Sequence, residues 1–166
     1  MIIRGYKAFY NDMTNQVGMH FEEGETYIAH LPIKENYKGN GYHFAKNLED
    51  TLCFVDDKDL EIKVAEVTGS GIICQYEYDY YGYYDLYCAE KIKIDKILTR
   101  EEVLNTILDK FEFSAERFVK YYKLTVEEIG LFKKHYSYSV GVLDAIAYYQ
   151  ENDKSVYERK YMKKRY

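Results

Sequence analysis

The segment from Tyr76 to Tyr87 concentrates side chains that are suited to binding a partner. Seven of its twelve residues are tyrosine, and three carboxylates lie between them. A tyrosine ring offers a large apolar area and one polar hydroxyl at a small cost in side-chain entropy, which is why protein interfaces use it. We therefore expect an acidic surface that binds a protein. Its candidate residues are Tyr76, Glu77, Tyr78, Asp79, Tyr80, Tyr81, Tyr83, Tyr84 and Asp85.

Gly82 lies near the middle of this segment and favours a β-hairpin that turns at or close to it. The same pattern is typical of a purely structural hairpin, in which facing rings form pairs worth ~0.2 to 1 kcal/mol each. Single-stranded nucleic acid also stacks on aromatic rings, but it needs nearby basic side chains, and none occurs between residues 76 and 87. Protein binding and a structural role both stay open at this point.

Recognisable catalytic motifs are absent from the sequence. It contains no GxSxG, P-loop or GxGxxG pattern, and its four histidines form no HxxxH or HExxH arrangement. The three cysteines, Cys53, Cys74 and Cys88, form no CxxC pair, so we expect buried thiols. We expect no metal site and no cofactor, and enzymatic catalysis is disfavoured.

The composition is that of a small globular protein. The chain has 166 residues, of which 47% are hydrophobic and 31% charged, which suits one packed domain with a helical appendage. No apolar run reaches the ~18 to 20 residues that cross a bilayer, and the N-terminus lacks the layout of a signal peptide. We therefore expect a cytoplasmic protein that does not contact a membrane.

Charge is distributed unevenly along the chain. Residues 47–95 hold 12 acids and 4 bases, a net charge of −8, whereas residues 154–166 hold six bases and one acid, a net charge of +5. Such asymmetry predicts an acidic face that meets a basic partner, with a separate basic tail.

The first hundred residues predict a sheet with one short helix. Apolar and aromatic runs indicate strands, and Asn47 is expected to cap a helix that ends near Phe54. The Gly69-Ser70-Gly71 stretch is expected to turn the chain between two strands. The expected strands are residues 2–10, 25–31, 42–44, 60–68, 72–78 and 86–94.

Four helices are predicted in the remainder of the chain. Thr99 and Thr125 each begin a capping box, with a glutamate three residues later. Ser114 and Ser139 are expected to cap the other two helices. The fold class is therefore α+β: an N-terminal, mainly antiparallel sheet with one short helix, followed by an all-helical C-terminal segment. The expected domains are residues 1–98 and 99–166.

Six short segments, in order, resemble an uncharacterised domain that is common in phage and prophage proteins. The resemblance covers about residues 3–98 and implies a phage or prophage accessory protein that acts in a bacterial host. The segments are Gly5-Tyr6-Lys7-Ala8-Phe9, Gly18 to Tyr27, Gly41-Tyr42-His43-Phe44, Leu48-Glu49-Asp50, Ala65-Glu66-Val67 with Gly69, and Lys91-Ile92-Lys93-Ile94.

A more distant resemblance is to ADP-ribosyltransferases. Arg4 on an early strand, Gly41 to Phe44 before a helix, and Val64 to Val67 follow the order of that family's motifs. The resemblance implies an NAD-dependent enzyme that modifies a host target. Arg4 and Tyr42 or His43 would then border a nucleotide pocket.

The leading expectation is an anti-defence, anti-CRISPR-like inhibitor that binds a host protein. Its acidic, tyrosine-rich hairpin would occlude a basic surface that normally receives nucleic acid. An ADP-ribosyltransferase-like enzyme is the alternative, and a DNA-associated protein that uses the C-terminal helices is the second alternative. The last of these helices, residues 139–150, carries no Arg or Lys, which disfavours direct nucleic-acid binding. Self-association through the aromatic hairpin stays open.

Overall fold

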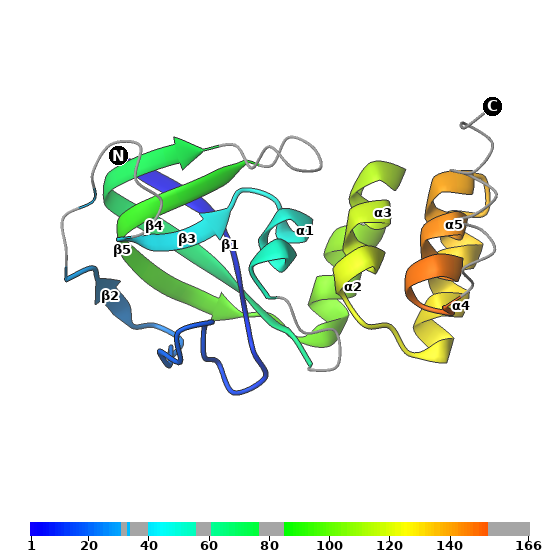
Figure 1. The fold of residues 1–166 in the computed structure, drawn as a ribbon, viewed down its shortest axis with the longest axis horizontal. Helices are drawn as coiled ribbons and strands as arrows, with labels where there is room; N and C mark the ends of the chain where they lie inside the picture. The colour runs from blue at the N-terminus through cyan, green and yellow to red at the C-terminus, as the bar shows by residue number, and fades with distance from the viewer. Residues whose placement is uncertain (31–32, 34–39, 56–60, 77–84, 153–166) are drawn as a thin grey trace, which may run out of the picture. The chain divides into compact units, whose positions relative to one another are not determined.

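The chain forms two compact units, Met1–Leu104 and Asn105–Tyr166. The structure is a computed structural model, and it describes residues 1–30, 33, 40–55, 61–76 and 85–152 (Figure 1). Among these residues, no helix combines the length and the apolar character needed to cross a bilayer. An antiparallel sheet with a short helix is followed by further helices, so the expected α+β class is confirmed.

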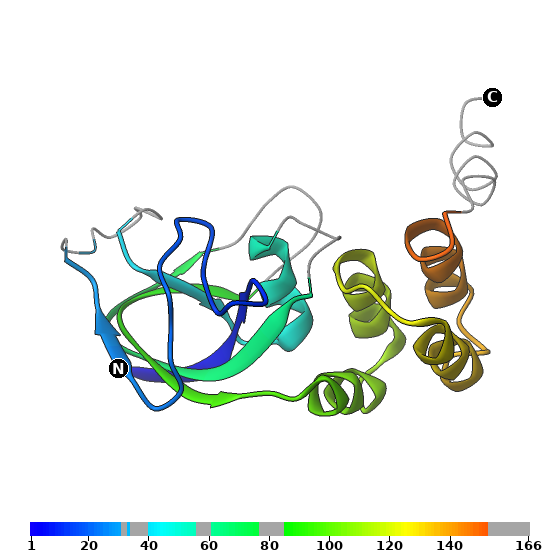
Figure 2. The same cartoon turned by 90° about the horizontal axis from the view of Figure 1, so that it is seen from below.

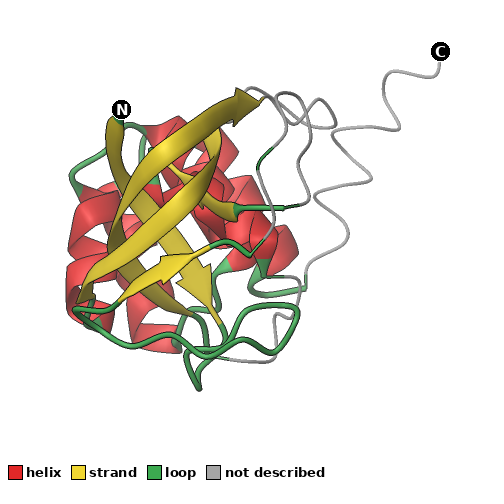
Figure 3. Cartoon of the chain, turned by 90° about the vertical axis from the view of Figure 1, so that its left-hand side faces the viewer, coloured by secondary structure: helices red, strands yellow, loops and turns green. Residues whose placement is uncertain are grey.

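Five strands form the antiparallel sheet of the first unit. The strand order is β2-β5-β3-β1-β4, and β4 also pairs with β5. The four strands β1, β4, β5 and β3 are therefore each paired with two of the others, and the sheet closes on itself (Figure 2). The two longest strands, β4 and β5, are strongly twisted (Figure 3). The strands are β1 (Ile2–Phe9), β2 (Thr26–Ile28), β3 (Tyr42–Ala45), β4 (Lys63–Tyr76) and β5 (Leu86–Ile97).

Alternate positions of these strands bury the core of the first unit. Successive strand residues point to opposite faces, so Gly5, Lys7 and Phe9 of β1 share the face that turns toward the core. Gly5 is required where β1 approaches β3, because a Cβ at this position would lie 2.2 Å from the carbonyl oxygen of Ala45. The buried cluster consists of Phe9, Phe21, Phe44, Ala65, Val67, Tyr87, Ala89, Ile92 and Ile94.

The turn predicted at Gly69-Ser70-Gly71 is wrong, because β4 runs through these residues without a break. Gly71 has a φ of +78°, and the register of β4 against β5 shifts between Ser70 and Ile73. These features define a β-bulge, which bends a strand without reversing the chain. The two strands expected on either side of the glycines are therefore one strand of 14 residues.

A short helix, α1 (Leu48–Thr51), continues into a 3-10 turn, η1 (Leu52–Phe54), close to the position expected. Asn47 precedes the helix as its N-cap residue, but its side chain accepts no hydrogen bond from the helix backbone. Instead, its amide nitrogen donates to the carboxylate of Asp50 at 3.0 Å.

Four further helices follow β5 in the described part of the chain, which ends at residue 152. Ser139 caps the last of them by accepting a hydrogen bond from the backbone N–H of Val142, as expected. Ser114 does not cap the second one. It lies within the first turn of that helix, whose N-cap residue is Phe111. The helices are α2 (Arg100–Leu108), α3 (Glu112–Tyr121), α4 (Val126–His135) and α5 (Val140–Tyr149).

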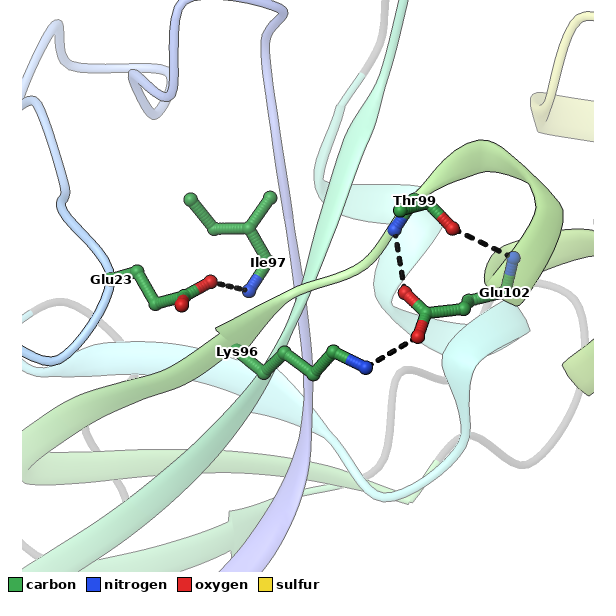
Figure 4. A network of polar contacts seen from close by, with 5 residues as sticks. All are labelled: Glu23, Lys96, Ile97, Thr99 and Glu102. Atoms are coloured by element: carbon green, nitrogen blue, oxygen red, sulfur yellow. Dashed lines mark hydrogen bonds and ion pairs between the residues drawn. The ribbon is translucent and has the colours of Figure 1, made fainter.

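The end of β5 is joined to α2 by a polar network (Figure 4). Thr99 and Glu102 form the expected capping box, with distances of 2.9 and 3.2 Å between side-chain oxygens and backbone nitrogens. The Glu102 carboxylate also accepts a hydrogen bond from Lys96. One residue further along β5, the backbone N–H of Ile97 donates to the carboxylate of Glu23 at 2.7 Å. The start of α2 is therefore held by contacts with residues close to it in the sequence.

Aromatic side chains form the core of the second unit. The ring of Phe118 on α3 stacks on that of Phe132 on α4, with centroids 5.8 Å apart. Tyr136, which follows α4, is fully buried, and its hydroxyl donates to the carbonyl oxygen of Ile107 at 2.8 Å. That oxygen belongs to the last turn of α2 and also accepts from the backbone N–H of Lys110 at 2.9 Å, so Tyr136 adds a second hydrogen bond to this helix end.

Candidate functional site

The tyrosine-rich segment connects the two longest strands of the sheet. β4 and β5 pair antiparallel as far as Tyr76 and Leu86, which face each other in the register. Residues 77–84 lie outside the described residues. Seven of the nine candidate partner-binding residues therefore lie there: Glu77, Tyr78, Asp79, Tyr80, Tyr81, Tyr83 and Tyr84.

The other two candidates, Tyr76 and Asp85, stand at the base of this connection. The Tyr76 hydroxyl is hydrogen-bonded to Nδ1 of His43, and the two rings meet edge-on with centroids 5.5 Å apart. The backbone carbonyl of Asp85 accepts from the N–H of Lys46 at 2.9 Å, and its carboxylate accepts from the Gln75 side chain at 3.3 Å. Both residues thus hold the end of the hairpin to neighbouring parts of the sheet.

Arg4 lies at an open cavity of about 600 Å³. Tyr6, Glu66 and Asp95 also line it, so its wall carries both signs of charge. The hydroxyl of Thr68 donates to the Asp95 carboxylate at 2.5 Å. Partial burial raises the pKa of Tyr6, and the nearby carboxylate of Glu66 raises it further.

His43 lies at a second cavity, of about 380 Å³. The cavity opens where β1 and β3 diverge, since Tyr6 and Ala45 are the register pair that joins these strands. Its described lining includes Lys7, Asn15, Gln16, His43, Phe54 and Tyr76.

Lys7 is the unusual residue of this second cavity. Its side chain is only 6% exposed, and its Nζ donates to the backbone carbonyl oxygen of His43 at 2.8 Å. The ammonium also lies over the rings of Phe9 and Phe21, at 5.5 and 5.9 Å from their centroids. Burial lowers the pKa of Lys7 to about 8, because water no longer solvates the charged form. The nearby Cys88 raises the pKa of Lys7, but by less than burial lowers it.

Tyr42 occupies a third environment. It is partly buried against the core, with its ring centroid 6.0 Å from that of Phe21, and its hydroxyl donates to the carbonyl of Ile28 at 3.4 Å. Partial burial raises the pKa of Tyr42. The three residues proposed for a nucleotide pocket, Arg4, Tyr42 and His43, are therefore not brought together in one cavity, since Arg4 and His43 line different ones.

The cysteines belong to the sheet and to η1. Cys74 on β4 and His43 on β3 both face Cys88 on β5 in the strand register. Burial raises the pKa of Cys88, and burial together with the nearby Asp50 raises that of Cys53 to about 12. Within the described ranges, no group of three or more His, Cys, Asp or Glu side chains is placed to hold a metal ion.

Sequence reasoning did not single out Lys7 as a functional residue. The sequence contained a signal for its burial. Gly5, Lys7 and Phe9 are alternate residues of one strand and lie on the same face, and Phe9 had to face a core. A lysine at an inward position of an otherwise apolar strand predicts a buried charge.

The fold and its cavities define an α+β protein with a sheet that closes on itself and a buried lysine at a ligand-sized cavity. A family model for a domain of unknown function, DUF7666, matches residues 3–106, and the chain therefore belongs to the DUF7666 family. The expected resemblance to an uncharacterised domain is confirmed, whereas a phage origin and a likeness to ADP-ribosyltransferases stay predictions. No curated protein and no solved structure gives a significant match.

Proposed function

We propose that the protein inhibits a protein partner by covering a basic surface that normally binds nucleic acid. The observation that supports this most directly is the pairing of Tyr76 with Leu86 at the end of the longest hairpin. A segment that joins two paired strands is held at both ends, which reduces the entropy lost when it orders on a partner.

Charge supports the same proposal. The segment contains three carboxylates and no base, and Glu90 adds a further carboxylate beside the bulge at Gly71. Complementary charge speeds the association of an acidic surface with a basic one and disfavours acidic partners. Tyrosine rings supply apolar contact area, which charged side chains alone do not provide.

The biological setting is part of the proposal. A phage or prophage accessory protein would use such a surface against a host defence effector that binds nucleic acid, as an anti-CRISPR-like inhibitor does. This step depends on the resemblance to a domain common in phage and prophage proteins, and the DUF7666 match carries no function of its own.

The test is a capture experiment with the full chain immobilised and an extract of a bacterial host passed over it. The proposal expects one stoichiometric nucleic-acid-binding protein of unchanged mass, which loses its nucleic acid when the chain is added. A target that gains the mass of ADP-ribose would contradict occlusion and favour the enzymatic alternative.

A matched pair of variants then assigns the surface. The double variant Tyr80→Ala, Tyr84→Ala is expected to weaken binding by ~2 kcal/mol or more, about 30-fold, if these rings are hot spots. The control is Phe113→Ala on α3, which removes a large exposed ring from another part of the chain. Equal affinity of the double variant and the control would exclude the tyrosine-rich segment.

A further inference from the structure

We infer that the cavity beside Lys7 is a binding site for a small organic anion, a carboxylate or a phosphate monoester attached to an apolar body. The site shares Tyr76 with the tyrosine-rich segment, but it does not depend on the function proposed above.

The first argument is an unneutralised buried cation. Lys7 is more than nine-tenths buried, yet among the described residues no carboxylate lies within ion-pair distance of its Nζ. Buried ammonium groups in folded proteins are normally paired, because the loss of hydration is costly. An anion in the cavity would supply the missing counter-charge.

The second argument is unused hydrogen-bonding capacity. An ammonium group has three N–H donors, and the hydrogen bond from Lys7 goes to the carbonyl oxygen of His43. The rings of Phe9 and Phe21 stabilise the charge but accept no conventional hydrogen bond. Two donors therefore have no acceptor among the described residues, and Lys7 lines the cavity, which suits the two oxygens of a carboxylate or the three of a phosphate monoester.

The third argument is the shape and chemistry of the cavity. Its volume of about 380 Å³ falls within the range of small-molecule sites. Val17, Phe54 and Val55 provide apolar surface for the body of a ligand. The hydrogen-bonded Tyr76–His43 pair lies on the wall formed by β3 and β4 and makes this side of the cavity polar.

Two other candidates are weaker. The cavity beside Arg4 carries both signs of charge, since Glu66 and Asp95 line it together with Arg4 and Lys46, and it does not favour a ligand of either sign. The facing cysteines Cys74 and Cys88 lie on paired strands, and neither lines the cavity beside Arg4 or the cavity beside Lys7.

The direct test is a titration of the full chain with phenyl phosphate, benzoate, inorganic phosphate and acetate, each against sodium chloride at equal ionic strength. Calorimetry and the thermal unfolding midpoint are the readouts. The inference expects saturable binding of phenyl phosphate or benzoate, at least tenfold tighter than that of the matching small ion. Preference between the two aromatic probes distinguishes a phosphate from a carboxylate ligand. Absence of saturable binding by any probe overturns the inference.

A matched pair of variants assigns the binding to Lys7. Lys7→Gln removes the charge but keeps an N–H donor for the His43 carbonyl, and it is expected to weaken binding at least tenfold. Lys46→Gln removes a lysine that lines the other cavity, and it is expected to bind like the unaltered chain. Equal affinity of Lys7→Gln and the unaltered chain would overturn the assignment.

If Lys7→Gln fails to fold, the pH dependence of anion binding by the unaltered chain tests whether Lys7 binds the anion. The titratable groups around the Lys7 ammonium are His43 on β3, Tyr76 on β4 and Cys88 on β5. Loss of the Lys7 proton is expected to weaken binding about tenfold for each pH unit above the pKa of about 8. Affinity that is constant between pH 7 and pH 10 would exclude Lys7 as the anion-binding group.

Discussion

The Nζ of Lys7 and the backbone carbonyl of His43 join β1 to β3 at the place where the two strands separate. Tyr6 and Ala45 are the register pair between these strands. Beyond it, the N–H of Ala8 donates to the Thr51 hydroxyl at 2.9 Å, not to β3. The Lys7 side chain therefore connects β1 to β3, Thr51 connects β1 to α1, and the cavity lies beside these contacts.

The cost of burying Lys7 predicts a distinctive pH dependence of stability. The pKa of Lys7 is about 8 in the folded protein and 10.5 without burial. Between these values the unfolded chain binds more protons, so this residue adds stability as pH rises. Below pH 8 both states are protonated and the full cost, about 3 kcal/mol, is present. Above pH 10.5 Lys7 is neutral in both states, and its burial no longer carries this cost.

Replacing Lys7 by Met should remove this dependence. From pH 7 to pH 10, the free energy of unfolding of the unaltered chain is expected to rise by about 2 kcal/mol relative to Lys7→Met. Urea titrations at several pH values measure the difference, and Lys46→Met serves as the control because Lys46 is exposed. A difference that is independent of pH would contradict the burial of a charged Lys7.

The close approach of β1 to β3 predicts that Gly5→Ala is destabilising. The new Cβ would lie 2.2 Å from the Ala45 carbonyl oxygen, and backbone cannot move aside as a flexible side chain does. We expect a loss of about 2 kcal/mol or more of unfolding free energy in urea. Gly130→Ala is the control, because a Cβ on this exposed position of α4 meets nothing within 4 Å. It should stabilise the helix by ~0.5 to 1 kcal/mol.

The capping box of α4 predicts that Thr125→Ala is destabilising by about 1 kcal/mol, since the N–H of Glu128 loses its acceptor. Val126→Ala changes the next residue, which is 81% exposed and makes no capping contact. It should change the free energy of unfolding by less than about 0.5 kcal/mol. Similar losses for the two variants would show that the capping box contributes little.

The raised pKa of Cys53 predicts slow alkylation. A thiol with a pKa of about 12 is almost entirely protonated at pH 8, and only the thiolate reacts. We expect iodoacetamide to modify Cys53 at least 100-fold more slowly in the folded chain than in urea, as measured by peptide mass spectrometry. Comparable rates in the two conditions would mean that Cys53 is not held in its buried position.

The sequence was sufficient to predict helix caps whose contacts join neighbouring residues. The capping boxes at Thr99 and Thr125 and the cap at Ser139 depend on residues three positions apart, and all three were predicted correctly. Ser114 failed as a cap because α3 begins three residues earlier, after Phe111. Ser is a common N-cap residue and Phe is not, so residue type alone pointed to the wrong position, and the Phe111 side chain makes no capping hydrogen bond.

Features that depend on distant partners were harder to predict. Gly69 and Gly71 are typical of a turn, but β4 pairs with both β1 and β5 and stays continuous. The glycines therefore lie at a β-bulge and not at a turn. The cavity beside Lys7 joins residues from β1, β3 and β4 that lie up to 69 positions apart. No local pattern contains that information, although the inward parity of Lys7 indicated its burial.

The pairing of β1 with β4 also affects how the protein is made. Ile2 faces Ser70 in the register, so Ile2 leaves the ribosome 68 residues before its partner in β4. At about 5 to 20 residues per second, this delay lasts roughly 3 to 14 s. During that time the apolar side chains of β1 are exposed on a nascent chain, where they are a binding site for chaperones that act during translation.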